Sequence, residues 1–101
     1  ELEKIVVEET VKEICNYFQI DPYASISEGT LIILCRPHKA DQVVQALAAK
    51  GIRSSIAGEM TEASQGMILV KEGKETKLVH PIVDPFWRAF YNAVSGEKPG
   101  R

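Results

Sequence analysis

The sequence predicts an α/β sandwich, a mixed sheet of about four strands with roughly two to three helices packed on it. Three features lead to this fold class: an unbroken apolar run, the helical apolar stripe that follows it, and strand-like segments joined by a glycine turn. A strand, a helix and a second strand in succession imply a crossover connection within one sheet. We therefore expect residues 1–101 to form a single domain.

The first helix is predicted over residues 9–19. Its apolar residues recur at the spacing of one helix face: Val11, Ile14, Cys15 and Phe18. Asp21 and Pro22 should end this helix, because the residue before a proline avoids the α region and an aspartate side chain closes a local turn. A loop is then expected through Gly29.

The segment Leu31–Cys35 is apolar throughout and contains the β-branched Ile32 and Ile33, which is typical of a central strand packed on both faces. The next helix should run from Pro37 to Lys50 and stop at Gly51. It carries the clearest apolar stripe of the chain: Ala40, Val43, Val44, Leu47 and Ala48.

Three further strands are predicted at residues 52–57, 66–71 and 75–80, with a short strand also compatible with residues 4–7. The strands at 66–71 and 75–80 should form a hairpin. The last helix begins after the cap-like pair Asp84-Pro85, and we expect its aromatic face to pack on the sheet rather than dock a partner. Residues 95–101 are expected to be a flexible tail.

Composition excludes several classes of function. The net charge of -2 provides no basic field, so we expect no nucleic-acid partner. No apolar run reaches the roughly 18 residues of a membrane span, and no signal peptide opens the sequence, so a cytoplasmic location is expected. The cysteines lack metal or disulfide spacing and are interpreted as buried thiols, and His38 and His80 lack a third ligand. No metal site is predicted.

An acid and a glycine stand together at two places. Glu28 and Gly29 precede the apolar run, where partial desolvation would raise the pKa of Glu28 and suit it to act as an acid, a base or an anchor. The alternative is a turn residue beside a glycine with positive φ. Gly58 and Glu59 end the strand predicted at 52–57, where open α/β sheets bind ligands; the alternative is the start of a plain loop.

The order of motifs over residues 11–62 resembles the C-terminal domain of the aminoimidazole ribonucleotide (AIR) synthetase superfamily. The motifs are Ile20-Asp21-Pro22 after a helix, Glu28-Gly29-Thr30 before an apolar strand, a helix led by Pro37, and Gly58-Glu59 closing the next strand. Within the superfamily, the resemblance is closest to the hydrogenase expression/formation protein HypE and to HypE-like AIR synthase-related proteins.

This resemblance implies a two-domain, ATP-using, homodimeric enzyme of which this chain is a C-terminal fragment. The N-terminal domain would hold most of the ATP and Mg²⁺, and the C-terminal domain would close the cleft. Glu28 would be the catalytic acidic residue. Gly29, Thr30, Gly58 and Glu59 would help to bind the cofactor. In the HypE branch the enzyme acts in hydrogenase maturation, with a maturation partner, and the fragment by itself would be inactive.

The resemblance departs from the HypE branch at the end of the chain. HypE carries its substrate on a C-terminal cysteine, whereas this sequence ends Lys98-Pro99-Gly100-Arg101, so the dehydratase chemistry is not carried over. Other classes of function stay open. The domain is alternatively a stand-alone regulatory module that binds a small molecule or a protein, or a packing and dimerisation domain without catalytic residues.

Overall fold

The computed structural model describes residues 1–96, and their contacts divide the chain into two units. The first unit combines Glu1–Val6 with Leu31–Val79, and the second combines Val7–Thr30 with the described residues from His80 onward. The single-domain organisation stays a prediction. Of the tail expected at 95–101, residues 97–101 lie outside the described part of the chain.

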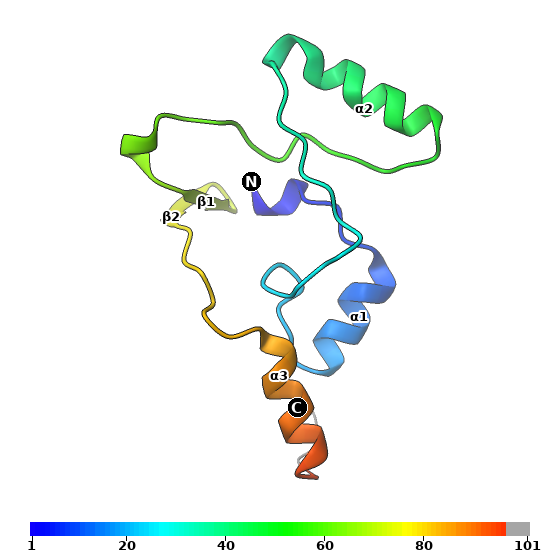
Figure 1. Cartoon of the computed structure of the whole chain (residues 1–101), viewed down its shortest axis with the longest axis vertical. Coiled ribbons are helices and arrows are strands. Elements are labelled where there is room, and N and C mark those ends of the chain that lie inside the picture. The colour runs from blue at the N-terminus through cyan, green and yellow to red at the C-terminus, as the bar shows by residue number, and fades with distance from the viewer. Residues whose placement is uncertain (97–101) are drawn as a thin grey trace. The chain divides into compact units, whose positions relative to one another are not determined.

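The first unit contains one α-helix, a two-stranded sheet and short 3-10 helices (Figure 1). In chain order these elements are η1 (Leu2–Lys4), η2 (Pro37–Lys39), α2 (Ala40–Ala49), η3 (Ala63–Gln65), β1 (Ile68–Lys71) and β2 (Lys74–Lys77). Although η1 opens the sequence, it lies against β1, so the first residues of the chain contribute to the fold of this unit.

The helix predicted from Pro37 to Lys50 is confirmed as η2 running directly into α2. Proline at the start of η2 costs no hydrogen bond, because the first N–H groups of a helix have no partner within it. At the other end Gly51 adopts φ of 74°, and the Ile52 N–H donates to the Leu47 carbonyl at 3.0 Å. The glycine therefore ends the helix as the sequence predicts.

The predicted hairpin is also confirmed, with shorter strands than expected. β1 and β2 pair antiparallel, with Ile68 opposite Lys77 and Lys71 opposite Lys74. The connecting residues Glu72 and Gly73 have φ of 51° and 75°, the two positive values of a type I′ turn. This turn matches the right-handed twist of paired strands, which explains why a two-residue loop suffices.

The predicted sheet of about four strands is not found, because only β1 and β2 pair among residues 1–96. Neither of the predicted strands Leu31–Cys35 and 52–57 forms in the structure. Leu31 and Ile32 are 79% and 83% exposed rather than packed on both faces. An apolar run predicts a buried strand only if other elements cover it, and no described element does so here.

The second unit begins with α1 (Glu9–Tyr17), which ends two residues earlier than the predicted bound at residue 19. Gln19 takes φ of 55°, and the Ile20 N–H donates to the Cys15 carbonyl at 2.8 Å. This is a Schellman cap in which Gln19 takes the position usually occupied by glycine. The cap, rather than Pro22, therefore ends α1. The predicted aspartate turn follows, since Asp21 Oδ1 accepts from the N–H of Tyr23 at 2.9 Å.

The final helix, α3 (Pro85–Val94), is confirmed with the predicted cap. Asp84 accepts a hydrogen bond from the Phe86 N–H at 2.9 Å. The aromatic rings of α3 contact one another, with centroids 5.9 Å apart between Trp87 and Phe90. Each ring remains about half exposed or more, so the packing of this face on a sheet stays a prediction.

Among residues 1–96 no apolar side chain is fully buried. The interpretation of both cysteines as buried thiols is therefore wrong: Cys15 is half-buried and Cys35 is exposed. Both thiols are free. None of the described helices combines the length and apolar character that crossing a membrane requires.

Candidate functional site

The predicted catalytic residue Glu28 lies in an exposed turn of the second unit. The hydroxyls of Ser27 and Thr30 flank this turn and share a hydrogen bond of 2.7 Å, in which either oxygen donates. This bond closes the loop around Glu28 and Gly29. The Glu28 carboxylate has no hydrogen bond or ion pair to other described residues, so it is available to a ligand.

Burial does not explain a special role for Glu28, because the described residues leave its side chain exposed. The expected positive φ at Gly29 is also absent, since Gly29 is not among the glycines with positive φ. A Cβ at Gly29 would meet no atom within 4 Å. Neither backbone conformation nor crowding within the described chain requires glycine here.

Gly58 and Glu59 belong to the first unit and lie in an irregular, exposed segment after Ala57. Gly58 resembles Gly29 in two respects: its φ is not positive, and a Cβ would meet nothing within 4 Å. The backbone just before it is held in place, since the Ala57 carbonyl accepts a hydrogen bond from the Glu1 nitrogen at 2.7 Å. Glu59 makes no hydrogen bond or ion pair to residues 1–96.

The structure brings Glu28, Gly29 and Thr30 together in one loop and places Gly58 beside Glu59 in one segment. These two groups of predicted site residues fall in different units. In both groups an exposed carboxylate lies next to a glycine at which a Cβ would meet no other atom. Such an arrangement suits close approach of a ligand to the backbone beside an acid or hydrogen-bond acceptor.

Sequence reasoning missed a carboxylate contact that joins the two ends of the first unit. Glu3 Oε1 accepts a hydrogen bond of 2.6 Å from the Glu72 N–H in the hairpin turn. Backbone N–H groups of Glu3 itself and of Glu72 donate to this carboxylate and lower its pKa below the ordinary value of 4.5. No local pattern predicts this contact, because the partners are 69 residues apart.

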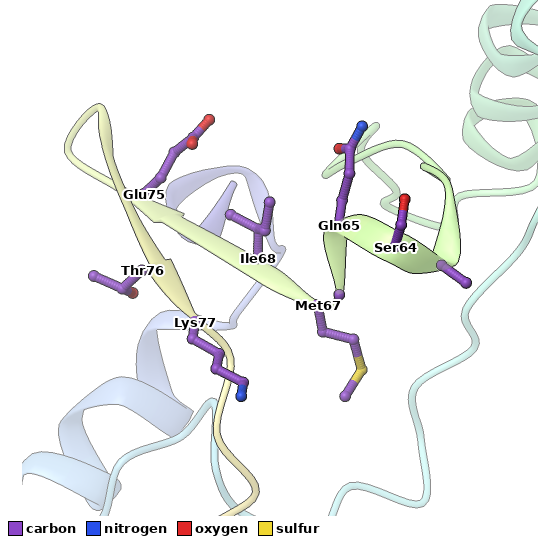
Figure 2. A pocket seen from close by; sticks show the side chains of 9 residues that line it. Ser64, Gln65, Met67, Ile68, Glu75, Thr76 and Lys77 are labelled. Atoms are coloured by element: carbon purple, nitrogen blue, oxygen red, sulfur yellow. The ribbon is translucent and has the colours of Figure 1, made fainter.

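An open pocket also lies in the first unit, where η3 approaches the hairpin (Figure 2). Its lining comprises Ala63, Ser64, Gln65, Gly66, Met67, Ile68, Glu75, Thr76 and Lys77. Figure 2 shows the charged ends of Glu75 and Lys77 pointing in opposite directions. Polar groups that converge on one point are what a specific small-molecule site requires, and this pocket does not provide them.

His80 is the residue at which the chain re-enters the second unit, and it has a local structural role. His80 Nδ1 accepts a hydrogen bond from the Ile82 N–H at 2.9 Å, in a turn where Ile82 takes φ of 65°. A β-branched residue rarely adopts this conformation, so the histidine helps to hold a strained turn. Within residues 1–96 no group of three or more His, Cys, Asp or Glu side chains is arranged to hold a metal ion.

Residues 2–78 match the model of a protein family described as AIR synthase related protein, C-terminal domain. The chain belongs to this family. The matched segment includes Glu28–Thr30 and Gly58–Glu59, so both groups of predicted site residues lie in the AIR synthase-related domain. The superfamily inferred from the motif order is thereby confirmed at the level of this domain.

The match to the AIR synthase-related domain ends at residue 78, at the end of the hairpin region. It therefore includes α1, α2, β1 and β2 but not α3. A search of the curated proteins and a search of the solved structures found no match to this chain. The family assignment consequently rests on the domain match and on the motifs within it.

Proposed function

We propose that this domain forms the C-terminal half of an ATP-dependent, AIR synthase-related enzyme of the HypE-like branch. It contributes one side of the substrate and nucleotide cleft. The N-terminal domain of the same protein contributes the other side and holds most of the ATP and Mg²⁺. The observation that carries this proposal is the domain match over residues 2–78, which spans both acid-glycine groups.

The local geometry of the two glycines supports a ligand-binding role. Gly29 and Gly58 have room for a Cβ and do not need positive φ, so the described chain itself gives no reason for glycine at either position. A ligand lying against the backbone provides such a reason, because a side chain there would occupy its space. Phosphate groups are ligands of this kind, since backbone N–H groups bind them at close range.

Glu28 is assigned the chemical step. In this step the γ-phosphoryl group passes from ATP to the substrate amide oxygen, ADP leaves, and the amide N–H proton passes to the Glu28 carboxylate. The Glu28 carboxylate is exposed and unpaired within residues 1–96, so it can reach a substrate N–H. Gly29 and Thr30 bind the cofactor beside Glu28, and Gly58 and Glu59 contribute cofactor contacts from the first unit.

The uncovered apolar segments support an assembly larger than these residues. Leu31–Cys35 and residues 52–57 expose apolar side chains, which would be stabilised by burial against further surface. We infer that both segments complete the four-stranded sheet when the domain packs within its full-length, dimeric protein. A role in hydrogenase maturation, with a maturation partner, belongs to the same HypE-like assignment.

Isothermal titration of the full-length protein with ATP and Mg²⁺ tests this function. We expect binding by the full-length protein and none by the 101-residue chain, because the N-terminal domain supplies most nucleotide contacts. Titration with Mg²⁺ alone serves as the control for heat that arises from metal binding. Absence of nucleotide binding by the full-length protein would refute the proposal.

A second candidate function is a protein-interaction module, and the aromatic face of α3 favours it. Phe86, Trp87 and Phe90 are 49%, 48% and 43% exposed, and they lie outside the segment that matches the family. Aromatic side chains are enriched where proteins bind one another. This function predicts a full-length protein without ATP affinity, so the same titration distinguishes the two candidates.

A further inference from the structure

The backbone that leads into Gly58 and Glu59 has no regular secondary structure, yet it is tied to a distant segment. Residues 1–6, which we call the N-terminal segment, provide these ties. The Ser55 hydroxyl donates to the Lys4 carbonyl, and in the 101-residue chain the terminal ammonium of Glu1 donates to the Ala57 carbonyl at 2.7 Å. Both contacts lie within three residues of Gly58, so the position of the N-terminal segment affects the position of this glycine.

The N-terminal segment is itself anchored to the hairpin. The Glu3 carboxylate accepts from the Glu72 N–H at 2.6 Å, and η1 lies against β1. Glu72 is held in the left-handed region by the type I′ turn, so its N–H has a defined direction. Hydrogen bonds to an ionised acceptor are shorter and stronger than neutral ones. Glu3 therefore links the N-terminal segment to the hairpin of β1 and β2.

We infer that Glu3 is a positioning residue for the proposed ligand-binding residues Gly58 and Glu59. It holds the N-terminal segment on the hairpin turn, and this segment holds residues 55–57, from which Gly58 and Glu59 project. All of these residues belong to the first unit. The effect of Glu3 on nucleotide binding rests on the proposed function. The structural connection from Glu3 to Gly58 rests only on the hydrogen bonds described above.

The link is tested by amide hydrogen exchange and NMR chemical shifts of the 101-residue chain. Replacing Glu3→Ala should accelerate exchange of the Glu72 amide about three- to tenfold, the range expected for one lost hydrogen bond at an exposed site. It should also shift the Gly58 and Glu59 amide resonances. Glu3→Gln should change both less, because the amide oxygen still accepts a hydrogen bond.

Two further variants make this test specific. Ser55→Ala removes the hydrogen bond from the Ser55 hydroxyl to the Lys4 carbonyl. It should shift the amide resonances of Gly58 and Glu59 and leave the exchange rate of the Glu72 amide unchanged. Glu13→Ala removes an exposed acid from α1, in the other unit, and should alter none of these signals. Unchanged Gly58 and Glu59 resonances in Glu3→Ala and in Ser55→Ala would overturn the inference.

The consequence for function is measured in the full-length protein. Glu3→Ala should raise the Kd for ATP with Mg²⁺ about three- to tenfold, and Glu3→Gln should recover most of this loss. Equal affinity of wild type and Glu3→Ala contradicts the positioning role. If the wild type binds no nucleotide, the proposed function fails, and the exchange and chemical-shift results still decide whether Glu3 positions Gly58 and Glu59.

Discussion

Two carboxylates of this domain, Glu3 and Glu28, differ in their surroundings. Glu3 accepts a backbone hydrogen bond and has a lowered pKa, so its charge is engaged in the structure. Glu28 is exposed and makes no hydrogen bond or ion pair to other residues in the range 1–96, so its carboxylate is open to a ligand. The two carboxylates therefore differ in their hydrogen-bond partners, a difference that the local sequence does not reveal.

The hydrogen bond of Glu3 should depend on pH. Because its pKa in the folded chain is lowered from 4.5, the ionised form stabilises the fold. This contribution is complete above pH 4.5 and is lost as the pH falls through the lowered folded value. We expect protection of the Glu72 amide, corrected for intrinsic exchange, to decrease on acidification in that window.

Two variants assign this pH dependence. Glu3→Gln should abolish it, whereas Glu72→Gln should retain it because the backbone donor of residue 72 is unchanged. The positive charges that also face Glu3 are the Glu1 amino group and Lys71, and neither loses its charge in acid. Persistence of the same transition in Glu3→Gln would contradict the assignment.

Replacing Glu28→Gln tests the proposed catalytic role. We expect ATP-dependent turnover of the full-length protein to fall at least about 100-fold, because general base catalysis contributes this much or more. Nucleotide affinity and far-UV circular dichroism should stay close to wild type, since the side chain is exposed. Glu13→Gln on α1 is the matched control. Unchanged turnover in Glu28→Gln would favour a packing role for this domain.

At the scale of elements, caps and turns account for the helices and the hairpin. Asp84 caps α3, Gly51 ends α2, and the pair Glu72-Gly73 closes β1 on β2. Each cap or turn depends on a few neighbouring residues, which is why the helix positions and the hairpin could be predicted. The end of α1 is the exception, because Gln19 takes the left-handed conformation that glycine usually supplies.

The type I′ turn predicts a stabilising substitution. Asparagine adopts positive φ more readily than glutamate and is preferred before glycine in such turns, so Glu72→Asn should raise the free energy of unfolding by about 0.5 kcal/mol. The Glu72 N–H that binds Glu3 is kept. Thermal unfolding and amide exchange of β1 and β2 measure the effect.

Glu75→Asn, placed within β2, provides the comparison. It should weaken the hairpin, because asparagine is disfavoured in strands. A gain in stability from Glu75→Asn as large as that from Glu72→Asn would mean that turn conformation is not the cause.

At the scale of the whole molecule, exposed apolar surface is the dominant feature. No apolar side chain within residues 1–96 is buried, although the run Leu31–Cys35 is typical of the centre of a sheet. Burial of apolar area is the main favourable contribution to folding, so a chain with this sequence gains stability when further surface covers it. This is the physical basis for placing the domain within a larger protein.

The reactivity of the Cys35 thiol measures whether further surface covers the apolar run Leu31–Cys35, because this thiol is exposed at the end of the run. In a Cys15→Ser background, Cys35 should react rapidly with a thiol reagent in the 101-residue chain and markedly more slowly in the full-length protein. Cys15→Ser leaves Cys35 as the one cysteine of this domain, and any cysteines elsewhere in the full-length protein are replaced in the same way. Equal rates in the two forms would show that nothing covers this segment.

The amino-acid sequence by itself determined the local features: α2 and α3 with their caps, the hairpin, the aspartate turn, and the motif order that indicates the family. These depend on spacing and backbone preferences within a few residues. Only the tertiary structure decided that Glu3 binds Glu72, that Leu31–Cys35 stays uncovered in this chain, and that Gly29 needs no positive φ. Such features depend on which distant residues meet, and local pattern carries no information about that.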